Sequence, residues 1–377
     1  MDKIFILNQS YPNPKSGDVG SAFVHVRAKF YAKYFDIEVV KISPTEESYV
    51  YEDIKVTCCR SYPLFLEYLK ATNPKAILAH FCESWMNAAA INNNIPIIIW
   101  VHGSEAHSWY RILFNIHGGN VIDFARFMLI NTISLRNFHR IIKLSKRSAK
   151  IHFVFVSDWM KRITFTDTLA STSKYSIIPN PIDTNLFKFT DKPVELRKKI
   201  LMIRSFNSSK YANDISMEAI LQLSKKPYFN DLEFTIYGKG VHWEKLTSKI
   251  AHLKNIKLVN KLVPQSEIPD LHRLHGVFLC PTRMDAQGVS MCEAMSSGLV
   301  PITSNNTAIP EFVTNKKTGF LTENANDVVK AIESLYNDPE QFRYMSQYAS
   351  KAISDKCGMD VVIENEKQLI AKMINSN

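Results

Sequence analysis

The sequence predicts an α/β protein built from two doubly wound domains, each a parallel sheet covered by helices on both faces. Short runs rich in β-branched residues alternate with segments of helical periodicity along all 377 residues, which is the pattern of parallel sheets. Continuous apolar runs such as Pro96–Val101 are typical of strands that are buried on both faces. At about 150 residues per domain, the length allows roughly two to three domains.

Strands are expected throughout the first half of the chain, starting at its amino terminus. Each is a short apolar run that ends in glycine or polar residues, as strands in open α/β sheets do. A stretch of helical periodicity, Val24–Tyr34, separates the first two. The expected strands are Lys3–Leu7, Ile37–Ile42, Ala76–His80, Pro96–Val101, His152–Val156 and Tyr175–Ile178.

The second half repeats this alternation, which predicts a second sheet of the same type. Its expected strands are Lys199–Ile203, Leu232–Tyr237, Ile256–Val259, Gly276–Cys280, Leu299–Thr303 and Gly319–Thr322. Its expected helices are Met217–Ser224, Glu244–Leu253, Glu267–Leu274, Ser290–Ser297, Asp327–Asn337 and a final helix over Val361–Ile374.

A polar segment with little periodicity separates the two halves. It covers residues 185–197, contains Pro193, and is followed at once by a new strand. We interpret it as a linker between an amino-terminal domain, 1–184, and a carboxy-terminal domain, 198–355. In open parallel sheets, ligands bind at the carboxyl ends of the strands, so the loops after the strands are where site residues are expected.

Composition excludes several classes of protein. With 46% hydrophobic and 22% charged residues, the chain is a globular protein and not a disordered one. No apolar run approaches the roughly 18 residues of a membrane span, and no leader peptide is apparent. The six cysteines are scattered without a CxxC pair, which argues against a zinc site or a disulfide framework. We therefore expect a cytoplasmic protein.

The net charge of +10 is concentrated in the first half. Residues 1–190 hold 22 basic and 15 acidic residues, whereas the remaining residues hold 24 and 21. A basic surface attracts anionic partners such as nucleic acid, phospholipid headgroups or phosphate-bearing ligands.

The richest motif follows the expected strand that ends at Cys280. A loop containing Asp285 leads into a helix that starts near Ser290, and Glu293 lies about one turn into that helix. Free backbone N–H groups and the helix dipole favour an anion at Gly288–Ser290, where glycine allows close approach. An ordinary capped helix with a surface glutamate is the alternative interpretation of these residues alone.

This segment resembles the signature of retaining glycosyltransferases of family 4 (GT4), which have the GT-B fold. The family pattern is a carboxylate, seven residues, Glu-Ala-Met, small-x-Gly and then a strand. Here it reads Asp285-x7-Glu293-Ala294-Met295-Ser296-Ser297-Gly298-Leu299-Val300-Pro301-Ile302. The resemblance implies two Rossmann-like domains facing across a cleft, with the carboxy-terminal helix, 356–377, crossing back onto the first domain.

The resemblance also implies donor-binding residues in the second half. Arg204 and Lys210 match the two cations that hold the donor diphosphate in the family, although a surface lysine is the alternative for Lys210. Gly238 matches a turn near the nucleotide base, and the loop with Leu262 and Val263 supplies contacts to the base. Beside the phosphate the family signature places residues that here are Gln287, Gly288, Val289 and Ser290.

In the first half, the resemblance implies two further site residues, Gly20 and His102, and the carboxyl ends of the strands offer two more, Glu105 and His80. Gly20 follows the first strand and would offer its backbone amide to the donor phosphate. His102 begins a His-Gly-Ser-Glu motif at the end of the strand Pro96–Val101, and in the family this histidine lies near the transferred sugar. Glu105 closes the motif on the acceptor side, and His80 is a further acceptor-side candidate.

A stretch without acidic residues, Phe124–Ser157, lies in the first half. Four of its basic residues have the spacing of one helical face: Arg136, Arg140, Lys143 and Arg147. Such a helix is typical of proteins that lie on an anionic membrane leaflet, and in the family the acceptor domain often docks there. A solvated face over a buried apolar stripe is the alternative.

Together these residues predict a retaining glycosyltransferase that moves a sugar from a UDP- or GDP-linked donor to a hydroxyl of a glycan acceptor. The resemblance implies a lipid-linked acceptor, a role in cell-surface polysaccharide synthesis, and a place on the inner face of the cell membrane. Glu293 would hold the ribose, Asp285 the donor sugar, and His102 the sugar or the incoming hydroxyl. No metal, other cofactor or nucleic acid is expected. The alternatives are another GT-B reaction (an epimerase or a phosphorylase) and a non-catalytic polyanion-binding protein.

Overall fold

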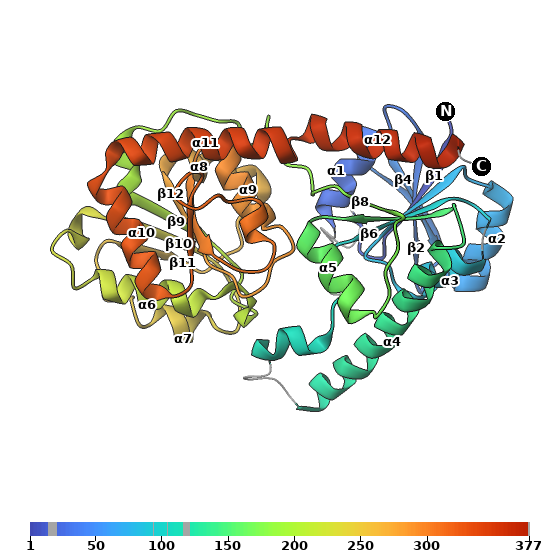
Figure 1. The fold of residues 1–377 in the computed structure, drawn as a ribbon, viewed down its shortest axis with the longest axis horizontal. Helices are drawn as coiled ribbons and strands as arrows, with labels where there is room; N and C mark the ends of the chain where they lie inside the picture. Colours follow the sequence, from blue (N-terminus) through green and yellow to red (C-terminus); the bar gives the residue numbers. More distant parts are fainter. Residues whose placement is uncertain (14–20, 93, 104, 116–120, 376–377) are drawn as a thin grey trace. The chain divides into compact units, whose positions relative to one another are not determined.

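The computed structural model describes residues 1–13, 21–92, 94–103, 105–115 and 121–375, and it divides into two compact units (Figure 1). The first comprises Met1–Arg111, Gly119–Pro181 and Asp360–Asn377, and the second comprises Ile112–Gly118 and Ile182–Met359. Each unit contains a sheet with helices packed against it. The predicted α/β class with two parallel-sheet domains is therefore confirmed.

The described residues of the first unit form one eight-stranded sheet in the order β3-β4-β2-β1-β5-β6-β7-β8. Every neighbouring pair is parallel except β3 with β4, which is antiparallel. The strands are β1 (Lys3–Leu7), β2 (Asp36–Ile42), β3 (Glu47–Tyr51), β4 (Ile54–Cys59), β5 (Ala76–His80), β6 (Ile97–Val101), β7 (Ile151–Phe155) and β8 (Tyr175–Ile177).

The hairpin β3–β4 was absent from the expected strands. Its turn places Glu52 and Asp53 in the left-handed region, with φ of 43° and 67°. Tight hairpin turns need this conformation, and Asn-Gly or Asp-Gly is the usual sequence signal for it. Because Glu52-Asp53 contains no glycine, the sequence carried no recognisable hairpin signal.

The helices of the first unit are α1 (Ala22–Tyr31), α2 (Tyr62–Thr72), α3 (Ser84–Asn92), α4 (Val121–Ser145), α5 (Asp158–Asp167) and α12 (Met359–Asn375). Of these helices, α4 is the longest. It runs obliquely, and its amino-terminal half extends beyond the sheet (Figure 1). It ends at Ser145, so the prediction that Arg147 shares its basic face is wrong. Arg147 lies in the following turn, where its N–H donates to the carbonyl of Leu144 at 2.9 Å.

The second unit, whose residues from Ile182 to Met359 are all described, holds an all-parallel six-stranded sheet in the order β11-β10-β9-β12-β13-β14. Its strands are β9 (Lys199–Ile203), β10 (Glu233–Tyr237), β11 (Ile256–Val259), β12 (Val277–Cys280), β13 (Val300–Ser304) and β14 (Phe320–Thr322). Its α-helices are α6 (Asn213–Leu223), α7 (Trp243–Thr247), α8 (Ile268–Leu274), α9 (Val289–Ser296), α10 (Ala325–Asn337) and α11 (Pro339–Cys357). Apolar side chains from this sheet and its helices form one buried core.

The carboxy-terminal helix α12 packs on the first unit through a buried ion pair. Glu366 of α12 is fully buried and accepts hydrogen bonds from Arg27 Nε at 3.0 Å, from Trp100 Nε1 at 3.1 Å and from the Tyr31 hydroxyl. Arg27 also donates to Asn180 Oδ1 at 3.1 Å. Several donors therefore compensate one buried carboxylate, which fixes α12 against α1 and β6. None of the described helices is long and apolar enough to cross a membrane.

Candidate functional site

The second unit gathers the predicted donor-binding residues at the carboxyl ends of β9 and β12. Arg204 directly follows β9 and is 7% exposed. Its guanidinium donates to the carbonyl of Cys280 at 2.9 Å and to the Ser290 hydroxyl at 3.2 Å. Arg204 is thus held in a fixed position beside the first turn of α9.

The first turn of α9 is shaped by Gly288 and Asp285. Gly288 precedes the helix with φ of 79°, a conformation that a side chain would strain. Its N–H donates to Asp285 Oδ1 at 2.9 Å, and the N–H of Gln287 donates to the same oxygen at 3.3 Å. Since the N–H groups of the first helical residues have no partner within a helix, those of Val289 and Ser290 are the donors that the turn offers to an anion.

Two predicted cations lie on one aromatic ring. Arg204 Cζ is 5.3 Å and Lys210 Nζ is 5.6 Å from the centroid of the Tyr211 ring. Cation–π attraction acts within about 6 Å, so Tyr211 stabilises both positive charges close together. The backbone of this segment is anchored because the carbonyl of Lys210 accepts from Arg283 N at 2.7 Å. Sequence reasoning missed Tyr211, because its role depends on the loop that brings both cations to it.

Glu293 lies on α9, and burial raises its pKa to about 7, although a hydrogen bond from Gln265 acts in the opposite direction. Gln265 Nε2 is 3.4 Å from Glu293 Oε1. Gln265 starts the short helix η5 (Gln265–Glu267), directly after the loop that holds Leu262 and Val263. Gln265 therefore links the loop that is predicted to contact the base with the carboxylate that is predicted to hold the ribose. Sequence reasoning missed Gln265.

The other residues predicted to bind the donor differ in how tightly they are packed and how exposed they are. Gly238 packs so closely that an added Cβ would lie 2.3 Å from the Arg204 carbonyl oxygen, so only glycine fits there. Leu262 is 66% exposed and free to contact a ligand. Gln287 is 1% exposed as a whole residue, with its Nε2 3.9 Å from Cys357 Sγ and its N–H donating to Asp285, so it shapes the turn before α9 from within the core.

In the first unit, His102 lies just after β6 in a tightly packed aromatic setting. Its Nε2 is 3.0 Å from His80 Nδ1, and its ring contacts those of Phe23 and Phe81 at centroid distances of 5.1 Å and 4.5 Å. Glu105 accepts hydrogen bonds from His102 N and Gly103 N, so the motif closes on itself. Burial raises the pKa of the Glu105 carboxyl despite these hydrogen bonds. Gly20 lies outside the described residues.

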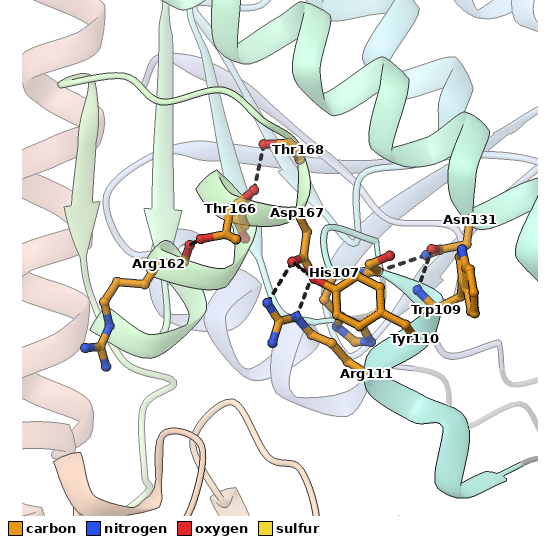
Figure 2. A network of polar contacts seen from close by, with 11 residues as sticks. His107, Trp109, Tyr110, Arg111, Asn131, Arg162, Thr166, Asp167 and Thr168 are labelled. Carbon is orange, nitrogen blue, oxygen red and sulfur yellow. Dashed lines mark hydrogen bonds and ion pairs between the residues drawn. The ribbon is translucent and has the colours of Figure 1, made fainter.

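A buried carboxylate anchors the segment that follows this motif (Figure 2). Asp167, at the end of α5, accepts from Ser108 N at 2.7 Å, from the Tyr110 hydroxyl at 2.7 Å and from Arg111 through two nitrogens at 2.6 and 2.7 Å. Burial alone would raise the pKa of Asp167, but the bonds from Arg111, Ser108 and Tyr110 outweigh it and lower the pKa. Asn131 of α4 bridges the same segment (Figure 2), because it donates to the His107 carbonyl and accepts from Trp109 N.

An open groove of about 640 Å³ lies between Glu105, the residues from Phe81 to Trp85 at the start of α3, and α4. Its walls are largely apolar, and the carboxyl groups of Glu83 and Glu105 both line it. The lining side chains are Phe81, Trp85, Phe127, Ile130, Ile133, Asn131 and Ser134, together with Cys82 and Ser84. A site of this kind suits a ligand with both apolar and hydroxyl groups.

The exposed side of α4 changes character along the helix. In its amino-terminal half, Ile122, Leu129, Ile130 and Ile133 are 50–73% exposed. In its carboxy-terminal half the predicted cations Arg136, Arg140 and Lys143 are exposed, while Phe138, Ile141 and Ile142 are buried beneath them. The alternative of a solvated face over a buried apolar stripe therefore describes only the second half of the helix. Across the described residues, no cluster of three or more His, Cys, Asp or Glu side chains is arranged to hold a metal ion.

Comparison with solved structures identifies the architecture as the GT-B fold. Sucrose-phosphate synthase from Thermosynechococcus elongatus superimposes with a TM-score of 0.78 at 12% identity, and the match covers 100% of both chains. Anabaena HepE in complex with UDP-glucose gives a TM-score of 0.69 at 15% identity, again over 100% of each chain.

Residues 184–352, somewhat less than half of the chain, match the family model described as glycosyl transferases group 1. Among curated relatives, α-monoglucosyldiacylglycerol synthase of Acholeplasma laidlawii is 24% identical over 54% of this chain and 57% of the relative. The Escherichia coli UDP-Gal:α-D-GlcNAc-diphosphoundecaprenol α-1,3-galactosyltransferase is 25% identical over 57% of this chain and 58% of the relative. The chain thus spans little more than half the length of these two relatives.

Proposed function

We propose that the protein is a retaining glycosyltransferase of the GT4 type that takes its sugar from a UDP-linked donor. The observation that carries this is the preformed anion site in the second unit, where Arg204 contacts Ser290 at the start of α9 and shares the Tyr211 ring with Lys210. Fixed cations and a helix N-terminus stabilise a departing diphosphate without reorganisation. Uridine is supported by the neighbouring structures of HepE, which hold UDP or UDP-glucose.

In this proposal, each of the predicted site residues has one role. Arg204, Lys210 and the N–H groups at the start of α9 bind the diphosphate. Glu293 accepts hydrogen bonds from the ribose, and Asp285, which already orders the turn before α9, holds the donor sugar. His102 contacts the sugar or the incoming hydroxyl.

A panel of nucleotide-sugars tests the proposal. The protein is incubated with UDP- and GDP-linked hexoses, and both its melting temperature and the release of nucleoside diphosphate are measured, since a ligand that binds only the folded state raises the melting temperature. We expect stabilisation and slow donor hydrolysis with at least one UDP-sugar. Arg204→Ala is the matched variant and should lose both effects. No response to any donor would contradict the proposal.

We further propose that the acceptor is lipid-linked and is reached at an anionic bilayer, so that the protein acts as a peripheral membrane protein in glycan assembly. The observation that favours this is α4, where exposed aliphatic residues precede the exposed cations Arg136, Arg140 and Lys143. Apolar side chains enter the boundary of the headgroup region. Cations bind anionic headgroups, and each cation near the bilayer surface contributes about 1 kcal/mol of binding free energy. Two relatives carry lipid names: one is a diacylglycerol glycolipid synthase, and the other acts on a diphosphoundecaprenol-linked sugar.

Sedimentation with vesicles containing phosphatidylglycerol tests this second proposal. Two variants separate the contributions, one with Leu129, Ile130 and Ile133 changed to Ser and one with Arg136, Arg140 and Lys143 changed to Glu. Both should lose vesicle binding. The control changes exposed lysines of the second unit, Lys245, Lys249 and Lys254, to Glu with the same loss of charge and should still sediment. Equal loss in the control would show a non-specific charge effect and contradict the role of α4.

A further inference from the structure

The turn that carries Lys210 depends on contacts from outside itself. It is the short helix η3 (Ser209–Tyr211), between β9 and α6, and it ends at Ala212 in the left-handed region with φ of 47°. Within it, the Ser208 hydroxyl accepts from Lys210 N at 3.0 Å, and Ala212 N donates to the Ser209 carbonyl at 3.1 Å. So short a 3₁₀ turn closes few hydrogen bonds, and a residue with a side chain is strained in the left-handed region, so other parts of the protein must fix the turn.

Arg283, in the connection between β12 and α9, supplies these contacts. Its N–H donates to the Lys210 carbonyl at 2.7 Å, and its guanidinium Nη1 donates to the Ser209 carbonyl at 2.7 Å. The same guanidinium forms a two-point ion pair with Asp214 in the first turn of α6, with Nη1 2.8 Å from Oδ1 and Nη2 2.6 Å from Oδ2. One side chain therefore joins the η3 turn to the helix that follows it.

The effect of this ion pair is geometric. The Asp214 side chain is 49% exposed and the Arg283 side chain 30%, and ion pairs at such exposure contribute little to stability by charge alone. A guanidinium, however, binds a carboxylate and a carbonyl at once in a fixed plane, which a lysine ammonium does not reproduce. Both terminal nitrogens of Arg283 donate to the protein in this way, so its side chain anchors the turn.

The turn in its turn determines where the Lys210 ammonium lies. A lysine side chain is flexible, so the region that its ammonium reaches depends on where its backbone is held. With the turn fixed, Lys210 Nζ and Arg204 Cζ lie 5.6 and 5.3 Å from the centroid of the Tyr211 ring. Arg204 is fixed separately, by its contacts with Cys280 and Ser290. The spacing of the two cations therefore depends on the anchoring of the η3 turn.

We propose that Arg283 is a positioning residue: through the η3 turn it holds Lys210 at the spacing from Arg204 that a diphosphate requires, before the donor binds. Binding energy is then not consumed in ordering the turn, which is the advantage of a preorganised site. This role toward the donor rests on the proposed function, whereas the anchoring of the turn does not.

Hydrogen exchange of the ligand-free protein tests the anchoring by itself. Arg283→Lys keeps the positive charge but loses the two-point contact, so the amides of Lys210 and Ala212 should exchange several-fold faster. Arg273→Lys is the matched control and should leave these amides unchanged, because Arg273 also pairs with an aspartate, Asp270 of α8, at 2.7 Å. Equal exchange rates in Arg283→Lys and the wild type would overturn the proposal.

Calorimetric titration with UDP tests the role toward the donor. We expect Arg283→Lys and Asp214→Asn each to bind UDP about three- to tenfold more weakly, which corresponds to the ordering of one long side chain on binding. The sign of the change in Asp214→Asn is decisive, because removing a negative charge beside the cationic turn would by charge alone strengthen the binding of an anion. Unchanged or tighter binding in Asp214→Asn would overturn the proposal.

A double-mutant cycle shows whether Arg283 acts through Lys210. If it does, Lys210→Ala combined with Arg283→Lys should bind UDP no more weakly than Lys210→Ala alone. Losses that add up would show that Arg283 acts on the ligand directly and would overturn the positioning role. A wild type that binds no nucleotide would contradict the proposed function and with it the role toward the donor, while the exchange rates would still decide whether Arg283 anchors the turn.

Discussion

The ionisation of Glu293 makes nucleotide binding depend on pH in a direction that the structure specifies. Burial raises the pKa of this carboxyl to about 7, so at pH 6 only about one molecule in ten carries the carboxylate, and at pH 8 about nine in ten do. Hydrogen bonds from ribose hydroxyls need an acceptor, and the carboxylate is a stronger one than the acid. The affinity for UDP should therefore rise about tenfold from pH 6 to pH 8, or roughly 1.4 kcal/mol.

Calorimetric titration with UDP measures this dependence. At pH 6, binding should release protons from Glu293, which is seen as a heat that changes with the ionisation enthalpy of the buffer. The β-phosphate of UDP also ionises in this range, so Glu293→Gln is the matched control, because it keeps the ligand and removes only the carboxylate. The wild type should gain more affinity than the variant as the pH rises. Identical pH profiles in the two proteins would refute the assignment of Glu293 to the ribose.

The same shift in pKa has a consequence for stability. The folded-state pKa of Glu293 is raised above the ordinary value of 4.5, so the folded protein binds the extra proton between these values. The favourable contribution is complete below about pH 4.5 and is lost as the pH rises through about 7. Glu293→Gln should therefore gain stability relative to the wild type on going from pH 6 to pH 8, which urea unfolding at both values measures.

Three further perturbations follow from contacts in the two units. Arg204→Ala removes a charge-assisted contact worth about 1.5–3 kcal/mol, so UDP should bind one to two decades more weakly by calorimetry, and unchanged affinity would place the diphosphate elsewhere. Glu366→Ala leaves Arg27 as an uncompensated buried charge and should destabilise the protein by about 3–5 kcal/mol in urea unfolding, whereas a loss below 1 kcal/mol would show that the pair is solvated. Asp167→Ala removes the acceptor of Ser108 N, so hydrogen exchange of that amide should accelerate with little change in UDP affinity; an unchanged exchange rate would mean that the segment is held by other contacts.

The alternation of apolar runs and helical segments was sufficient to predict the fold class, because strand burial and helix periodicity are local properties of the sequence. The runs at Lys3–Leu7 and Lys199–Ile203 appear as strands with the predicted bounds. The hairpin β3–β4 escaped prediction, because its turn adopts a left-handed conformation without glycine. The predicted helix Glu244–Leu253 was too long, since α7 ends at Thr247 and turns follow it.

The candidate site was predictable only to the extent that its residues belong to a linear motif. Arg204 and Ser290 are 86 positions apart in sequence, yet the resemblance assigned both to the diphosphate, and the structure brings them within 3.2 Å of each other. The contacts of Tyr211 depend on how the connection after β9 folds back on itself, whereas Gln265 and the partnership of His80 with His102 depend on contacts between segments that follow different strands. Nothing in the spacing of these residues reveals such contacts, because they arise only when the ends of the strands meet at one edge of a sheet.

The position of a bound diphosphate tests the central claim most directly. A crystal structure of the protein with UDP should show the β-phosphate at the first turn of α9, within hydrogen-bonding distance of the Arg204 guanidinium and the Ser290 N–H. It should also show the ribose hydroxyls on Glu293. UDP bound at any other place in the second unit, or a phosphate that Arg204 does not contact, would contradict the account.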